Sequence, residues 1–248
     1  MQLRRPAPRP NDLPALRARV AALRLKGPSS PQVEQARKLL LLYLDTAAAH
    51  AVPFADMARD LRSGLPALRI AGAQLEQQAT DPSGPLTQAA CASGCAFCCI
   101  LSGTDGGTIL EAEARALHDA LQPLAGQPDG RDWHPRACPA LDPATRNCRV
   151  YATRPLICRT YVSSDATACA EIAKGTPATG AGVLGAQGLM LAVQALARAA
   201  LDGVTQVPTY SMARVAAAAI AGKAAKDTLR SARHPPRTLD DERLRLGG

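Results

Sequence analysis

The chain has 248 residues, of which 47% are hydrophobic and only 3% aromatic, and its formal net charge is +8. This length suits one large domain or a domain with extensions, and the composition predicts a core built from Leu, Ala and Val. The basic charge comes mainly from dispersed Arg, and Trp133, Phe54 and Phe97 lie far apart in the sequence. Nucleic-acid binding is therefore not expected, because base stacking needs aromatic side chains near the basic groups.

Residues 1–10 carry Arg and Pro without an apolar core, which predicts a basic disordered tail and argues against an export signal. The most apolar stretch, residues 183–201, contains Gln187, Gln194 and Arg198. It favours a buried helix over a membrane span. We expect a cytoplasmic protein, where dense cysteines more often bind metal or do redox chemistry than form disulfides.

Residues 11–85 form a predicted N-terminal helical flank. Asn11 or Asp12 is placed to cap a first helix that ends at Gly27-Pro28, and a second helix follows Ser30-Pro31. Shorter helices are expected over 53–62 and 66–79, and the Pro- and Gly-containing residues 81–85 are expected to end the helical region.

The cysteine region is expected over 86–175, with one helix over 108–121 opened by a capping box of Thr108 and Glu111. Residues 122–155 are rich in Pro, Gly, Asp and Asn, and 148–151 is the best short strand candidate. A C-terminal helical segment follows over 176–230, with helices at 181–201 and 208–230, and a charged tail over 231–248. The fold class is thus mainly α, with helical flanks around a loop-rich, cysteine-ligated metal-binding core.

Four thiols, those of Cys91, Cys95, Cys98 and Cys99, fall within nine residues. In a helix they would share one face, whereas in a loop the two-residue gap between Cys95 and Cys98 lets two thiolates reach one ion. Either conformation converges the sulfurs on a metal. The first three cysteines, with Phe97, also match the pattern of radical S-adenosylmethionine enzymes, but no alternating strands and helices of a β/α barrel follow. A three-cysteine cluster with one open iron remains chemically possible.

The second half of the candidate site contains Cys138-Pro-Ala-Leu, then Cys148-Arg-Val-Tyr151 and Arg154-Pro155-Leu-Ile-Cys158-Arg159, and finally Cys169. Together with Cys95, Cys98 and Cys99, this series resembles the YkgJ-type cysteine-cluster family of zinc- or iron-chelating proteins. The first gap differs, because three residues separate Cys91 from Cys95 where the family has two. The resemblance implies metal ligation by the eight cysteines, which are Cys91, Cys95, Cys98, Cys99, Cys138, Cys148, Cys158 and Cys169.

Thiolates around a metal accumulate negative charge, which Arg154 and Arg159 are placed to offset while Tyr151 packs the short strand against the site. Cys98 and Cys99 are adjacent, so their side chains diverge and both rarely bind one ion. Eight cysteines can serve two four-thiolate ions, or one cluster with spare thiols. We favour an iron–sulfur cluster, of the [4Fe–4S] type, over Zn²⁺ because the spacing differs from paired zinc knuckles.

Other polar side chains have simpler interpretations. His134 is predicted on a loop surface, His50 at a helix end, and His118 with Glu111, Glu113 and Asp119 on a solvated helix face. Residues 103–107 read as a turn, since they lack the Lys of a phosphate-binding loop.

Three functional hypotheses remain open. The first is a cytosolic metal-binding protein, and the second is a cluster-assisted, S-adenosylmethionine-dependent enzyme, because certain relatives in the resembled family are flagellin lysine methylases. The third is a redox or metal sensor that acts through a protein partner. Whether the protein is an enzyme is left open.

Overall fold

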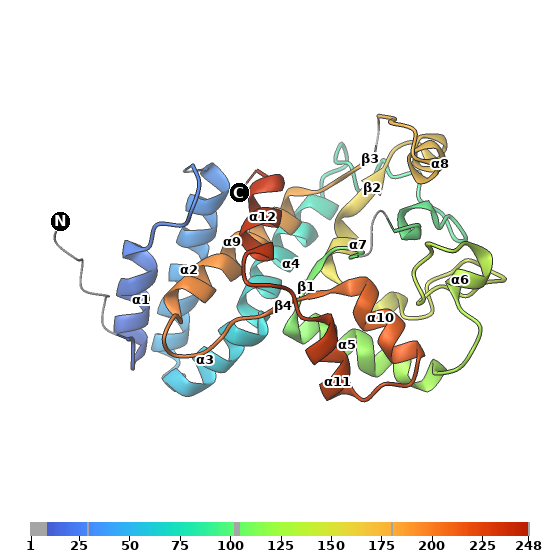
Figure 1. The fold of residues 1–248 in the computed structure, drawn as a ribbon. Helices are drawn as coiled ribbons and strands as arrows, with labels where there is room; N and C mark the ends of the chain where they lie inside the picture. Colours follow the sequence, from blue (N-terminus) through green and yellow to red (C-terminus); the bar gives the residue numbers. More distant parts are fainter. Residues whose placement is uncertain (1–8, 29, 102–104, 180, 248) are drawn as a thin grey trace.

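The computed structural model describes residues 9–28, 30–101, 105–179 and 181–247. Most of the predicted basic tail over 1–10, and part of the predicted turn over 103–107, lie outside these residues. The described chain is predominantly helical with a few three-residue strands, so the predicted mainly α fold class is confirmed (Figure 1).

The N-terminal flank folds into four helices: α1 (Leu13–Ala22), α2 (Pro31–Ala49), α3 (Phe54–Ser63) and α4 (Leu65–Ala79). Asp12 caps α1 by accepting the Ala15 N–H at 2.7 Å, and Ser30 caps α2 by accepting the Val33 N–H at 3.2 Å. Of the two cap candidates for the first helix, Asn11 and Asp12, the structure uses Asp12, and the second helix follows Ser30 as predicted. The first helix ends earlier than expected, at Ala22, because Leu23 already has an extended backbone.

Helix α9 (Gly185–Ala200) is the centre of the first hydrophobic core and packs against α1, α2 and α4. Its start differs from the prediction, because β3 (Ala181–Val183) occupies the first residues of the expected helix. Helix α12 (Thr238–Arg245) also packs on α9, with Leu239 and Arg243 buried. The segment predicted as a charged tail therefore contributes to the core.

A second core lies between α5 (Glu111–Leu121), α10 (Met212–Ile220) and α11 (Ala225–Ala232). An antiparallel pair, β1 (Thr108–Leu110) with β4 (Thr209–Ser211), leads into α5 and α10. Pairing of β1 explains why α5 begins three residues later than predicted, and the predicted capping box of Thr108 and Glu111 is wrong, because Glu113 takes that role at Leu110. The single helix expected over 208–230 is divided, since the chain turns at Gly222 with a φ of 72°.

The cysteine segment consists of short elements that lie at the right of Figure 1. In chain order they are η1 (Phe97–Cys99), η2 (Gln122–Leu124), α6 (Gly130–Trp133), η3 (Tyr151–Thr153), α7 (Leu156–Thr160), β2 (Tyr161–Ser163) and α8 (Ala166–Lys174). Strand β2 pairs antiparallel with β3. The strand predicted over 148–151 is not formed, because Cys148 makes only an isolated bridge with Leu141 and Tyr151 begins η3.

Helices of the N-terminal flank share the first core with α9 and α12 of the C-terminal part, and the predicted domain limits stay a prediction. Helices α1–α4 pack with α9 and α12, whereas α10 and α11 pack with α5 and the cysteine segment. Among the described residues, no helix combines the length and the apolarity that crossing a membrane requires.

Candidate metal centre

The run from Cys91 to Cys99 folds as tight turns rather than as an α-helix. The Cys95 N–H donates to the Ala92 carbonyl at 3.0 Å, and the Cys99 N–H donates to the Ala96 carbonyl at 2.9 Å. Cys98 and Cys99 end the one-turn helix η1. Of the two conformations compatible with the spacing, the structure has the loop.

Cys138 is brought against this run by backbone pairing. Its N–H donates to the Cys99 carbonyl at 2.8 Å, and Ile100 forms an antiparallel bridge with Ala137 beside it. Gly130 at the start of α6 lies so close to the Cys138 carbonyl that a Cβ there would collide with it. The thiols of Cys99 and Cys138, separated by 39 positions in the sequence, are thereby held on neighbouring segments of the backbone.

Cys148 joins them through a second bridge. Leu141 pairs with Cys148, and the Arg149 N–H donates to the Ala140 carbonyl at 2.9 Å. The Asn147 side chain accepts hydrogen bonds from the Ser93 hydroxyl and the Gly94 N–H, both at 2.9 Å. These bonds tie the loop before Cys148 to the turn that carries the first cysteines.

Cys158 completes the inner group, which we define as Cys98, Cys99, Cys138, Cys148 and Cys158. It lies in α7, whose first residue, Leu156, donates its N–H to the buried Glu113 carboxylate at 2.6 Å. Cys138 belongs to the second core, and Cys99, Cys148 and Cys158 pack against that core. Three separate segments of the chain thus supply the inner group.

The inner thiols shift one another's pKa values, which shows that they share one electrostatic environment. Burial raises the pKa of Cys138 to about 11 and raises that of Cys158, with the neighbouring sulfurs adding to both. The hydrogen bond between Cys98 and Cys99 raises the pKa of Cys99 and lowers that of Cys98 to about 7. Several thiolates so close together are mutually unfavourable without a cation, and a metal ion supplies the opposing charge.

The other three cysteines form an outer group, Cys91, Cys95 and Cys169. Cys169 lies in α8, which packs against η1, and burial raises its pKa, with Cys95 and Cys91 adding to the effect. Cys98 contributes to the pKa shifts in both groups, so its charge acts on both. None of the eight cysteines is in a disulfide.

The donor set fits a thiophilic metal, because clustered thiolates bind zinc or iron–sulfur irons. In the described parts of the chain, no three Cys, His, Asp or Glu side chains stand in positions that could hold one ion as they are. The fit is therefore one of donor chemistry and proximity, and ligation would require the sulfurs of the inner group to converge further.

Comparison with known proteins places all eight cysteines within a single match. Residues 90–176 match the model of the CxxCxxCC family, described as a putative zinc- or iron-chelating domain. The match covers about a third of the chain, and the matched segment is called the CxxCxxCC domain here. The resemblance found in the sequence is confirmed, and metal chelation is the function that the family description supports. No curated protein and no solved structure matches the chain.

The three residues predicted to support the metal take different positions in the CxxCxxCC domain. The charge of Arg154 helps to lower the pKa of Cys98 and opposes the effect of burial on Cys148. The guanidinium carbon of Arg154 lies 3.4 Å from the ring centre of Tyr151. Tyr151 is 65% exposed, so the prediction that it packs against the site is wrong. Arg159 is exposed, and its charge acts on Glu113.

The prediction of a solvated face on α5 is wrong. Glu111, Glu113 and His118 are buried, and only Asp119 is exposed. Glu113 accepts the Leu110 N–H at 2.9 Å as well as the Leu156 N–H, and burial raises its pKa. Its place at the third position of the helix is the signal that could have revealed its capping role.

The predicted positions of His50, at a helix end, and His134, in a loop, are confirmed. His50 caps the C-terminal end of α2. His134 follows α6 in a loop, where its Nδ1 accepts the Arg136 N–H at 3.2 Å.

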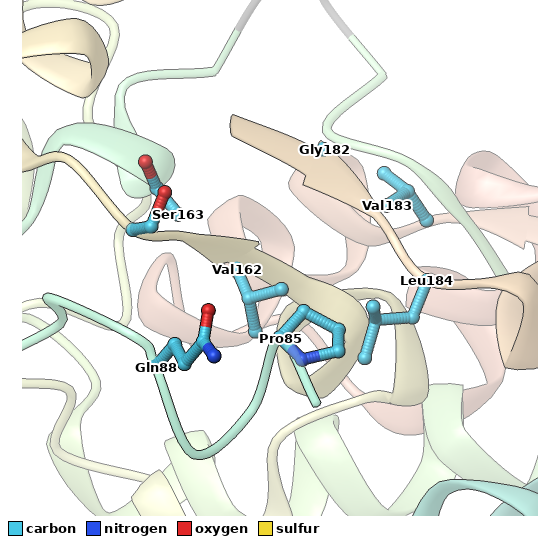
Figure 2. A pocket seen from close by; sticks show the side chains of 8 residues that line it. Pro85, Gln88, Val162, Ser163, Gly182, Val183 and Leu184 are labelled. Carbon is cyan, nitrogen blue, oxygen red and sulfur yellow. The ribbon is translucent and has the colours of Figure 1, made fainter. Parts of the chain in front are cut away.

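A hollow of about 240 Å³ lies beside the β2–β3 pair (Figure 2). Pro85 and Gln88 line one side of it, and residues of β2, β3 and the adjoining turns line the rest. No cysteine is among its lining residues, so the hollow is separate from the thiol groups.

Proposed function

We propose that the CxxCxxCC domain binds a metal centre through its inner group and that this centre is an iron–sulfur cluster in preference to zinc. Cys138, Cys148 and Cys158 are three ligands, and one of the adjacent pair Cys98 and Cys99 is the fourth. The observation that carries the proposal is the convergence of these thiols from three segments, with mutual shifts of their pKa values.

The charge of such a centre explains the surrounding residues. Four thiolates around Zn²⁺, or around an oxidised [4Fe–4S] core, leave a net charge of about −2 by simple counting. Arg154 offsets part of that charge from beside Cys98 and Cys148. The ligand thiols must lose their protons on binding, so metal uptake and proton release are coupled.

The outer group is a second, incomplete set of donors. Cys91, Cys95 and Cys169 provide three sulfurs, and three cysteines can hold a cluster that keeps one iron open. Because the charge of Cys98 acts on thiols of both groups, it is the residue through which they would be coupled electrostatically.

The enzyme alternative requires a pocket for S-adenosylmethionine beside the metal. The hollow in Figure 2 is not lined by any thiol, so it adds no support for a methylase. The sensor alternative requires an exposed reactive thiol, and Cys91 and Cys98 are both exposed. Metal binding is common to all three hypotheses, and it is the function we propose.

Purification without oxygen tests the proposal. We expect a brown protein with broad visible absorption that contains iron and sulfide. A colourless protein with stoichiometric zinc would exclude the iron–sulfur cluster but leave the proposal of metal binding standing. A protein without any metal would exclude both the cluster and metal binding. Cleavage of S-adenosylmethionine by the reduced protein would instead support the enzyme alternative.

A further inference from the structure

A methionine from outside the CxxCxxCC domain touches a thiol of the inner group. The Met212 sulfur, Sδ, lies 3.4 Å from the Cys158 Sγ, which donates a weak hydrogen bond to it. Met212 is the first residue of α10 and is only 4% exposed. It lies 36 positions after the end of the matched segment, so the fold alone brings the two sulfurs together.

The backbone around Met212 is held firmly. Its N–H donates to the Gly107 carbonyl at 3.1 Å, directly beside the β1–β4 pair. Gly107 has a φ of 106°, and a Cβ there would lie 3.1 Å from the side chain of Ile157, the neighbour of Cys158. Strand pairing and this close approach position α10 against α7, so the sulfur contact follows from the backbone and not from a free side chain.

The distance between the two sulfurs suits a shared metal ion. Two sulfurs bound to one tetrahedral ion at about 2.3 Å each are ~3.8 Å apart, within a few tenths of an ångström of the observed separation. Met212 also belongs to the same core as Cys138, with Cys99 and Cys148 packed against that core. A leucine would fill this space equally well, but only a thioether offers a lone pair to a soft metal.

We propose that Met212 is a thioether ligand of the metal centre held by Cys158 and takes the fourth ligand position in place of Cys98 or Cys99, so that a residue of the C-terminal segment completes the inner group. This inference rests on the proposed function, because it requires that the inner group binds metal. It adds a soft donor that none of the thiol patterns in the sequence contains, and it gives α10 a part in the metal centre.

Selenium absorption spectroscopy of the metal-loaded protein tests the inference. The full chain is labelled with selenomethionine, and the metal-loaded protein is compared with Met212→Leu and Met190→Leu. Met190 is a matched control, because it is also buried in a helix but lies in the first core around α9. Metal content is measured on each sample.

We expect a metal atom in the first shell of selenium in the wild-type protein and in Met190→Leu, and its loss in Met212→Leu. Met212→Leu should also bind metal several-fold more weakly, with the metal-free protein as stable as the wild type. Bound metal with no metal atom near selenium would overturn the inference and leave the proposed function standing. A wild-type protein that takes up no metal would overturn the proposed function, and the inference with it.

Discussion

The Glu113 carboxylate joins two helices at the edge of the metal centre by accepting the Leu156 N–H at 2.6 Å and the Leu110 N–H at 2.9 Å. The first bond fixes the start of α7, two residues before Cys158. A carboxylate buried in this way is a structural clamp, and it makes the position of Cys158 depend on α5.

Glu113→Ala should therefore destabilise the protein. It leaves two buried N–H groups without an acceptor, at about 1–3 kcal/mol each, and weakens metal retention at Cys158. Urea unfolding and metal content measure the two effects. Glu76→Ala, on the exposed side of α4, is the control and should change stability by less than about 0.5 kcal/mol. Equal stability of the two variants would exclude the clamp.

Asp129 links stability to pH. Burial raises its pKa, but the hydrogen bonds from Arg131 outweigh burial and lower it below the ordinary value of 3.8. A carboxylate with a lowered pKa stabilises the fold above that ordinary value, and the contribution is lost as the pH falls through the pKa of the folded state. As the pH falls below about 4, the stability of Asp129→Asn should therefore decrease less than that of the wild type.

Thermal unfolding between pH 2 and 7 measures this difference. Asp119, which is largely exposed on α5, provides the control substitution Asp119→Asn. Parallel acid profiles for the wild type and Asp129→Asn would show that the Arg131 pair contributes nothing to the pH dependence.

Arg154 and Arg159 should differ in their effect on the metal. The charge of Arg154 acts on Cys98 and Cys148, whereas that of Arg159 acts on Glu113. Arg154→Ala should weaken metal binding by roughly 2- to 5-fold, the size expected for one partly exposed charge, while Arg159→Ala has a smaller effect. Competition with a chelator at low salt gives both affinities. A larger loss in Arg159→Ala would reverse the assignment of the two guanidinium groups.

Gly130 should not tolerate a side chain. A Cβ at this position would collide with the Cys138 carbonyl, so Gly130→Ala should displace the loop that carries Cys138 and cost about 1–3 kcal/mol. Gly72→Ala is the matched control, because nothing lies within 4 Å of a Cβ there and alanine favours the helix. Urea unfolding of both variants decides the matter, and no loss in Gly130→Ala would contradict the close contact.

Substitutions in the inner and the outer cysteine group should have different effects on metal content. Cys158→Ala should lose the metal of the inner group and make the loops of residues 90–176 more sensitive to protease, because a bound metal would crosslink them. Cys169→Ala should retain the inner metal, since Cys169 lies in the outer group. Metal per chain and limited proteolysis report on both. Equal loss in the two variants would point to one centre that spans all eight cysteines.

Local sequence patterns were enough to find the starts of the first two helices and the chemical class of the site. Asp12 and Ser30 satisfy N–H groups three residues away, so their roles are readable without knowledge of the fold. The density of cysteines likewise indicates metal binding whatever the backbone does between them, and the matched family agrees.

Which residues contact one another across the chain depends on the complete fold. The pairing of Cys138 with Cys99, the burial of Glu113 and the contact of Met212 with Cys158 all join segments far apart in the chain. Helix α12 also depends on a distant segment, because Leu239 is buried where α12 packs against α9. Local patterns report hydrogen bonds between near neighbours, whereas burial depends on surfaces that distant segments provide, and no short window of sequence contains both partners.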